Sequence, residues 1–218
     1  LDDDVKYANP FRLVTLLDNH DLESRIFTTV LDAGYGGWDR NKAVETMNQL
    51  TTFLMTTRGI PQIYYGNEIG MEGYRDPKNR HDFPWHLFDD NWQIKQDTEA
   101  HIKPIYEHTR KMAKIRNEKS AVRHGYLLTL WVDDFAYVYA RALADDIVVV
   151  AFNNGQEDMP YPLQIPIGQN DNLPPWIKNT LLERNFVDAL DPSYETQGSS
   201  GELPIQVSGK SARVLLLK

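Results

Sequence analysis

The sequence predicts two parts of different class, an α/β part with a parallel sheet followed by an all-β part. Two short apolar runs separated by a long amphipathic stretch indicate the first part, because a strand–helix–strand order with short links produces parallel strands. Period-two alternation with frequent turn signals, which begins near Ser120, indicates the second part and is typical of an antiparallel sandwich. We therefore expect one domain over residues 1–118 and another over 119–218.

The α/β part begins with a strand expected at Phe11–Leu17, whose nearly continuous apolar character suits a strand buried on both faces. A polar, glycine-containing loop is expected at 18–40. Apolar residues then recur at spacings of three and four, which predicts a helix over Asn41–Thr57 with a broad apolar face. Gly59 ends this helix, and a second strand is expected at Ile60–Tyr65.

Residues 66–97 have little periodicity and are rich in Asp, Asn, Gly and aromatic residues. A loop of this length usually serves a function. A helix is expected from about Thr98 to Asn117, and Ser208–Ser211 is interpreted as a hairpin turn. The strands expected in the all-β part are 126–132, 135–143, 147–152, and others near 180–187 and 203–217.

Composition limits the classes of function. The 218 residues include 23 Lys and Arg against 31 Asp and Glu, a net charge of −8 that argues against a nucleic-acid partner. There is no cysteine, which excludes disulfides, thiolate zinc sites and cysteine nucleophiles. No apolar run approaches the ~20 residues needed to cross a membrane. The start at Leu1 reads as a piece of a larger chain or as a mature end, and localisation stays open.

Polar clusters follow both predicted strands of the α/β part, at Asp18–Asp21 and at Gly66–Glu68. Chemistry in parallel α/β folds gathers at the carboxyl ends of the strands, so the two clusters are expected to share one rim. They could bind sugar hydroxyls, hold a metal, or act as a base and its orienting partner. They could also simply cap the following turns. A metal is the least favoured, because no H-x-x-x-H spacing occurs.

The loop at 71–97 places aromatic residues among charged ones. Aromatic faces stack on the C–H faces of sugar rings while carboxylates and guanidinium groups bind the hydroxyls. The alternative is that the aromatic residues only attach a long loop to its own scaffold. The aromatic members are Tyr74, Phe83, Trp85, Phe88 and Trp92, and the polar members are Asp76, Asn79, Arg80 and Asp82.

Three motifs in order resemble the α-amylase superfamily of glycoside hydrolases and transglycosidases. Leu17–Asp21 (LDNHD) is similar to its fourth signature region, and Gly59–Glu68 (GIPQIYYGNE) is similar to its motif at the eighth barrel strand. Asp76–Arg80 (DPKNR), followed by Phe83–Trp85 (FPW), resembles the cyclomaltodextrinase, neopullulanase and oligosaccharide-glucosidase branches. The resemblance is strong over residues 11–117, whereas the all-β part resembles the superfamily's C-terminal β-sandwich only in character and place.

The resemblance implies the last two β/α units of a TIM (β/α)8 barrel, followed by an antiparallel β-sandwich. It implies retaining cleavage of α-1,4-glucosidic bonds in an α-glucan oligosaccharide. Asp21 matches the catalytic acid that stabilises the transition state, and His20 matches the histidine that binds the same sugar. Asp76 and Arg80 match a substrate-binding pair. The supporting residues are expected to be Asn19, Arg25, Glu68 and Trp85. No cofactor is implied, and structural Ca²⁺ stays open.

One departure from the family is serious. Retaining hydrolysis needs a nucleophile and an acid/base carboxylate, and neither of their signature regions occurs in the sequence. We therefore expect part of an enzyme that is inactive in isolation and prone to form a homo-oligomer through an exposed barrel edge near 11–17. The alternatives are a non-catalytic carbohydrate-binding or interaction homologue, an α-glucan transglycosidase, and an unrelated two-domain protein.

Overall fold

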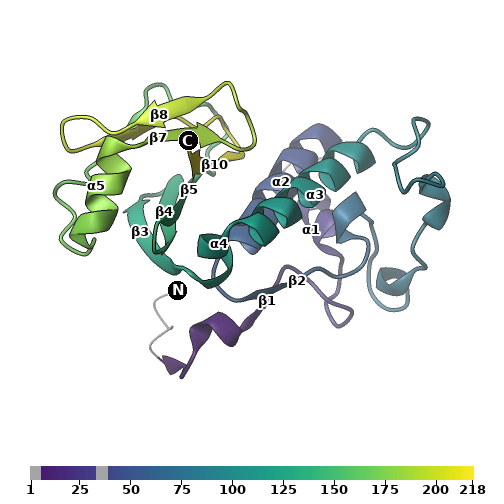
Figure 1. Ribbon diagram of the computed structural model, residues 1–218. Coiled ribbons are helices and arrows are strands. Elements are labelled where there is room, and N and C mark those ends of the chain that lie inside the picture. Colours follow the sequence, from purple (N-terminus) through teal and green to yellow (C-terminus); the bar gives the residue numbers. More distant parts are fainter. Residues whose placement is uncertain (1–5, 33–38) are drawn as a thin grey trace. The chain divides into compact units, whose positions relative to one another are not determined.

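The computed structural model describes residues 6–32 and 39–218 of the chain (Figure 1). They form two compact units. Unit 1 comprises Leu1–Met55 and Gly59–Ile115, and unit 2 comprises Thr56–Arg58 and Arg116–Lys218.

Unit 1 contains the predicted strand–helix–strand arrangement. Strand β1 (Val14–Leu16) pairs in parallel with β2 (Ile60–Gln62), with Val14 opposite Ile60. Helix α2 (Arg40–Thr56) lies between them in the sequence. The observed register confirms the predicted parallel pairing. Parallel strands need a long crossover connection, which here contains a helix rather than a hairpin turn. A short 3-10 helix, η2 (Pro10–Arg12), precedes β1.

The expectation that 18–40 is entirely loop is wrong, because helix α1 (Ile26–Asp32) lies within it. The backbone N–H of Ile26 donates to the Asp18 carboxylate at 2.8 Å, from a cap eight residues upstream. A cap at that distance leaves no local sequence pattern, which explains why the helix was missed. Part of the predicted loop, residues 33–38, lies outside the described residues.

The expected burial of the first strand is also wrong. Val14 is 53% exposed and Leu16 is 40% exposed, and β1 spans fewer residues than the predicted Phe11–Leu17. Among the described residues β1 pairs with β2 alone, so one edge of this strand is open. The apolar sequence is typical of an interior strand, but no described residue covers the side chains of Val14 and Leu16.

Helices α1, α2 and α3 (Ile102–Glu118) supply the core of unit 1. Phe27, Met47 and Ile105 are among its fully buried members. Three short 3-10 helices interrupt the long loop that precedes α3: η3 (Asn67–Ile69), η4 (Lys78–Arg80) and η5 (Trp85–Leu87). The loop is therefore an ordered structure that connects β2 to α3.

Unit 2 is mainly antiparallel. Its larger sheet has six strands in the order β3-β4-β5-β10-β7-β8, and β6 pairs with β9 in a second sheet of two strands (Figure 1). Two helices, α4 (Ser120–His124) and α5 (Pro175–Glu183), complete it. The strands are β3 (Tyr126–Val132), β4 (Ala136–Leu143), β5 (Asp146–Asn153), β6 (Leu163–Ile165), β7 (Asn185–Asp188), β8 (Glu195–Gln197), β9 (Leu203–Ile205) and β10 (Ser211–Leu217).

The first three strands of unit 2 lie where the alternation predicted them. Two later predictions need correction. The strand expected near 180–187 is the end of α5 followed by β7. The strands expected over 203–217, on either side of a hairpin turn at Ser208–Ser211, are β9 and β10. They belong to different sheets and do not pair, so Ser208–Ser211 connects the sheets and is not a hairpin turn. Pairing between distant strands decides this, and turn signals do not report it.

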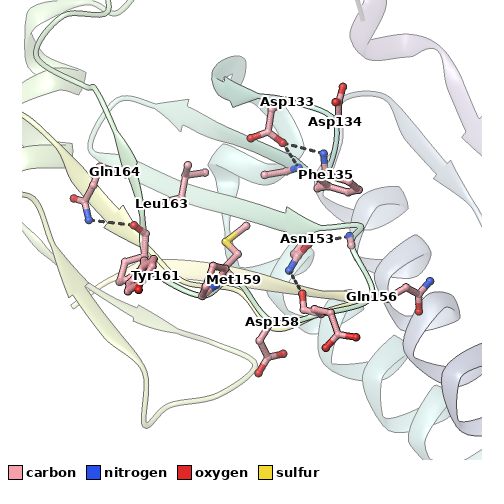
Figure 2. A pocket seen from close by; sticks show the side chains of 15 residues that line it. Asp133, Asp134, Phe135, Asn153, Gln156, Asp158, Met159, Tyr161, Leu163 and Gln164 are labelled. Atoms are coloured by element: carbon pink, nitrogen blue, oxygen red, sulfur yellow. Dashed lines mark hydrogen bonds between the residues drawn. The ribbon is translucent and has the colours of Figure 1, made fainter.

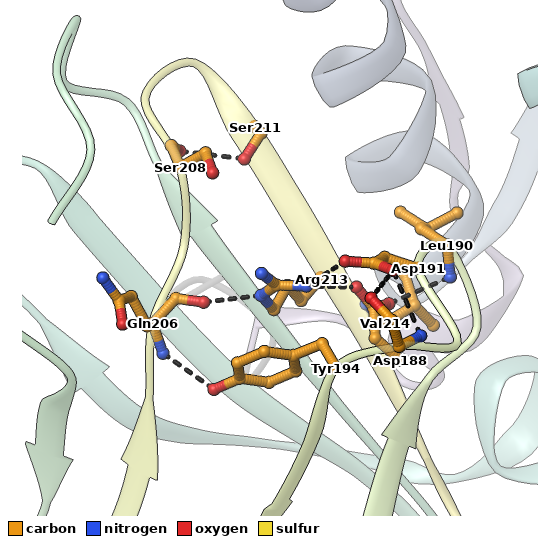
Figure 3. A network of polar contacts seen from close by, with 10 residues as sticks. Asp188, Leu190, Asp191, Tyr194, Gln206, Ser208, Ser211, Arg213 and Val214 are labelled. Carbon is orange, nitrogen blue, oxygen red and sulfur yellow. Dashed lines mark hydrogen bonds and ion pairs between the residues drawn. The ribbon is translucent and has the colours of Figure 1, made fainter.

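The core of unit 2 joins both sheets and α5. Its fully buried residues include Val149, Leu215, Ile165, Ile205 and Leu181. A polar network lies at the edge of this core (Figure 3), where the guanidinium of Arg213 pairs with Asp188 at 2.8 Å and lies 3.6 Å above the ring of Tyr194. Burial raises the pKa of Asp188, although Arg213 opposes the shift.

In the part of the chain that the structure describes, no helix has the length and apolar character of a membrane span.

Candidate active site

The first polar cluster stands where β1 ends. His20 Nε2 lies 3.2 Å from Asp21 Oδ1, and their side chains are 54% and 72% exposed. The side-chain oxygen of Asn19 accepts the backbone N–H of Asp21 at 2.8 Å. This local turn brings the imidazole and the carboxylate together at the surface, within reach of a ligand.

The loop after β2 brings Asp76 and Arg80 to the same place. Arg80 Nε contacts Asp76 Oδ1 at 2.9 Å, and one terminal nitrogen of Arg80 lies 3.8 Å from Asp21 Oδ1. The same nitrogen donates to the backbone carbonyl of His20 at 3.3 Å. Four residues predicted from separate motifs therefore meet through one guanidinium, which links the two loops.

Two residues of the predicted polar groups, Asn79 and Asp18, have supporting roles that the sequence did not predict. The side-chain amide of Asn79, which is buried, donates to the carbonyls of His20 and Leu22 at 3.0 and 2.9 Å. The Asp18 carboxylate, also buried, accepts hydrogen bonds from Ile26 and from the side chain of Asn67. Asp18 belongs to the predicted polar cluster. Only its burial indicates a structural role, and burial of a single Asp cannot be inferred from the sequence.

Arg25 lies behind the cluster and is fully buried. It donates to the carbonyl of Tyr65 at 2.6 Å, and its guanidinium carbon lies 4.6 Å from the ring centroids of both Tyr64 and Tyr65. The ring of Tyr64 in turn lies 6.5 Å from that of His20. A cation in contact with two aromatic rings is well stabilised. Arg25 therefore holds Tyr64, whose ring lies next to that of His20.

Glu68 and Trp85 lie in a different environment. Both line a cavity of about 440 Å³ together with Tyr65, Asp82 and aromatic residues of the following loop. Burial raises the pKa of Glu68, and the positive charge of Arg25 opposes this shift. Neither residue makes a hydrogen bond or an ion pair with Asp21 or Arg80 in the described part of the chain.

Unit 2 has a larger cavity of about 640 Å³ beside the turn that joins β3 and β4 (Figure 2). Its carboxylate Asp133 has structural partners. One oxygen accepts the backbone N–H groups of Phe135 and Ala136, and the other accepts the indole N–H of Trp131 at 2.8 Å. The Trp131 hydrogen bond lowers the pKa of Asp133. Asp133 therefore holds the turn, and this cavity offers no comparable pairing of carboxylate with imidazole.

The chemistry available at the first cluster is recognition of hydroxyl groups. A carboxylate that lies 3.2 Å from an imidazole and 3.8 Å from a guanidinium can, together with those two groups, accept from and donate to neighbouring hydroxyls of one sugar ring. Across residues 6–32 and 39–218, no group of three or more His, Asp or Glu side chains is arranged to hold a metal ion.

The fold is that of an α/β unit with a polar cluster at the ends of its parallel strands, followed by a mainly antiparallel β unit. Comparison with known proteins identifies the family. The family model described as "Alpha amylase, catalytic domain" matches residues 4–125. The chain belongs to the α-amylase family.

The chain is similar to a cyclomaltodextrin glucanotransferase from Bacillus sp. (strain 38-2), with 32% identity over 69% of this chain and 18% of that protein. A cyclomaltodextrinase from Geobacillus thermopakistaniensis (strain MAS1) is 31% identical over 66% of this chain and 22% of that protein. The crystal structure of an α-amylase from Geobacillus thermoleovorans, complexed with acarbose, aligns with a TM-score of 0.72 at 26% identity, covering 97% of this chain and 40% of that one. The chain thus spans about a fifth of the length of these curated relatives.

Proposed function

We propose that the 218 residues are the C-terminal part of a retaining glycoside hydrolase that cleaves α-1,4-glucosidic bonds in malto-oligosaccharides, starch or cyclodextrins. In this proposal residues 1–118 supply the last two β/α units of the catalytic (β/α)8 barrel, and 119–218 supply a β-sandwich domain. The observation that carries it is the joining of Asp21, His20 and Arg80 at the carboxyl ends of two parallel strands, in a chain of the α-amylase family.

Each residue of the cluster has a role in the proposal. Asp21 stabilises the oxocarbenium-like transition state, because its negative charge stands where positive charge develops on the sugar. His20 hydrogen-bonds the same sugar. Asp76 and Arg80 bind the neighbouring part of the substrate, and their ion pair of 2.9 Å fixes both side chains before binding.

Catalysis in this proposal needs more than these residues. A retaining glycosidase uses two carboxyl groups about 5–5.5 Å apart, a nucleophile and an acid/base. The sequence motifs that supply them in the family are not among the 218 residues. We therefore expect no release of glucose or maltose from maltotriose by this chain alone, and Asp21-dependent hydrolysis would contradict the proposal.

Binding tests the proposal directly. Acarbose should bind the chain in a calorimetric titration, and Asp21→Asn should weaken binding about 10- to 100-fold, the effect of losing a charge-assisted hydrogen bond. The control is Glu45→Gln, which removes an exposed charge from α2 and should leave the affinity unchanged. Equal affinity for the Asp21→Asn and unmodified chains would refute the assigned role.

A second candidate is an α-glucan transglycosidase, which the glucanotransferase relative favours. The two candidates share the cluster and differ in whether water or a sugar hydroxyl receives the glycosyl group. The ratio of transfer products to hydrolysis products formed by the full-length enzyme from maltotriose separates them. A full-length protein that binds acarbose but forms neither product would instead be a non-catalytic binding homologue.

We also propose that the chain in isolation self-associates through β1. Its open edge exposes backbone hydrogen-bonding groups, and Val14, Leu16 and Ile60 are 53%, 40% and 52% exposed. Such an edge is a template for pairing with a second copy. Light scattering should show a dimer or larger species, and Leu16→Lys should shift it to monomer. An unmodified chain that stays monomeric at high concentration would contradict this.

A further inference from the structure

An aromatic cavity in unit 1 is separate from the cluster of Asp21 and Arg80. Phe83 and Phe88 line it, with ring centroids 5.8 Å apart. Trp85 and Trp92 stand at its rim in an edge-to-face arrangement, 6.0 Å apart, and are 64% and 60% exposed. Its volume of about 440 Å³ falls within the usual range of about 300–1,000 Å³ for small-molecule sites.

The backbone of the loop adopts an unusual conformation at Trp92, which keeps the indole exposed. Trp92 has a φ of +59°, a conformation that bulky residues rarely adopt. The Asp89 carboxylate stabilises the turn by accepting the backbone N–H groups of Asn91 and Gln93 at 2.9 and 2.8 Å. Tyr106 of α3 donates to the carbonyl of Trp92 at 3.3 Å. Strain that several contacts maintain at an exposed indole is typical of a functional position.

Two carboxylates, Glu68 and Asp82, lie among these rings. Glu68 Oε2 is buried and has no hydrogen-bond partner in the described structure. This oxygen keeps its capacity to accept a hydrogen bond from a hydroxyl group that reaches it. The lining of the cavity, as far as the described residues define it, contains no Lys or Arg. Its chemistry disfavours an anion and suits a neutral ligand with hydroxyl groups and apolar faces or a cation, and the proposed function selects the neutral sugar between these two.

The cavity and the cluster are adjoining parts of one loop system. Tyr65 lines the cavity, and its hydroxyl donates to the carbonyl of His81 at 2.9 Å, next to Arg80. Asp82 follows directly. Tyr65 therefore joins the lining of the cavity to the segment that carries Arg80.

We propose that this aromatic cavity binds neutral glucose units of an α-1,4-linked oligosaccharide, with Trp85 and Trp92 stacking on the sugar faces and Glu68 and Asp82 binding hydroxyls. The proposal rests on the proposed function for its choice of sugar. It adds a second contact region for the same chain of glucose units, built from residues that take no part in the transition state.

The test uses the 218-residue chain and maltotetraose, followed by tryptophan fluorescence and by calorimetry. Trp85→Ala and Trp92→Ala should each weaken binding at least tenfold, and Trp85→Phe should restore part of the loss because a smaller ring still stacks. The matched control is Trp176→Ala on α5, which removes a tryptophan that is 44% exposed in unit 2 and should leave binding unchanged. Far- and near-ultraviolet circular dichroism establishes that each variant is folded.

The outcomes separate this proposal from the proposed function. A tenfold loss with Asp21→Asn but none with either tryptophan variant would overturn the aromatic site and leave the cluster intact. A loss with the tryptophan variants but none with Asp21→Asn would support the aromatic site and refute the role of Asp21. Absence of maltotetraose binding to the unmodified chain, or equal binding of cellotetraose, would overturn the assignment of an α-glucan.

Discussion

Asp18 should contribute more to the stability of unit 1 than any exposed helix cap. Its carboxylate is 1% exposed and has two partners, the backbone N–H of Ile26 at 2.8 Å and the side-chain amide of Asn67. It therefore joins the end of β1 both to α1 and to η3. Substitution by alanine removes both bonds at once and leaves two donors without this acceptor, the half-buried N–H of Ile26 and the buried amide of Asn67.

The magnitude follows from those two bonds. A hydrogen bond to a charged group contributes about 1.5–3 kcal/mol, so Asp18→Ala should destabilise unit 1 by about 3–5 kcal/mol. With a urea dependence of about 2 kcal/mol per molar, the unfolding midpoint should fall by roughly 1.5–2.5 M. The measurement is urea unfolding followed by circular dichroism and by tryptophan fluorescence, with Trp131 and Trp176 of unit 2 replaced by Phe in both the Asp18 variant and its parent so that the signal reports unit 1.

Asp39→Ala is the matched control. The carboxylate of Asp39 accepts a single bond from the backbone N–H of Asn41, at 2.8 Å, in an exposed position at the start of α2. Loss of an exposed cap costs about 1 kcal/mol, which moves the midpoint by roughly 0.5 M. If Asp18→Ala shifts the midpoint no more than Asp39→Ala does, at unchanged urea dependence, the reasoning about burial and paired contacts is refuted.

Three further perturbations test other parts of the structure. Burial lowers the pKa of His108 to about 4 from 6.5, so between these pH values the imidazole is protonated in the unfolded chain and neutral in the folded one. The free energy of unfolding should therefore fall by up to about 3 kcal/mol between pH 6.5 and pH 4. Urea unfolding of His108→Gln at each pH should show a weaker pH dependence. Arg213→Met leaves the carboxylate of Asp188 buried without its partner and should destabilise unit 2 by about 3–5 kcal/mol in thermal or urea unfolding; an unchanged midpoint would show that the ion pair contributes nothing. Gly59→Ala places a Cβ 2.5 Å from the carbonyl oxygen of Leu13 at a φ of +99°, so unit 1 should lose about 2–4 kcal/mol, whereas a wild-type urea midpoint would show that the turn can relax.

Local periodicity was enough to predict β1, α2, β2 and α3 of unit 1 in their order, and the first three strands of unit 2. The spacing of apolar residues in α2 and the alternation in β3, β4 and β5 are properties of neighbouring residues, and those elements formed where the patterns placed them. Helix α1 was not predicted because its cap, Asp18, lies eight residues before Ile26. The hairpin expected at Ser208–Ser211 is wrong because the sequence does not report that β9 and β10 join different sheets.

The candidate site divides in the same way. The motifs identified His20, Asp21, Asp76 and Arg80 as residue types that suit a sugar, and the family match to residues 4–125 confirms the resemblance that they carry. Their roles stay predictions. The sequence did not show that Arg80 joins the two loops, or that Glu68 and Trp85 face a separate cavity.

From the sequence alone follow the family, the strand–helix–strand order and the polar residues at the strand ends, because each depends on residues close together in the chain. The tertiary structure alone decided which loops meet, which carboxylates are buried and which oxygen lacks a partner. Those properties depend on contacts between residues such as Asp18 and Asn67, which are 49 positions apart, and contacts at that distance leave no periodic pattern in the sequence.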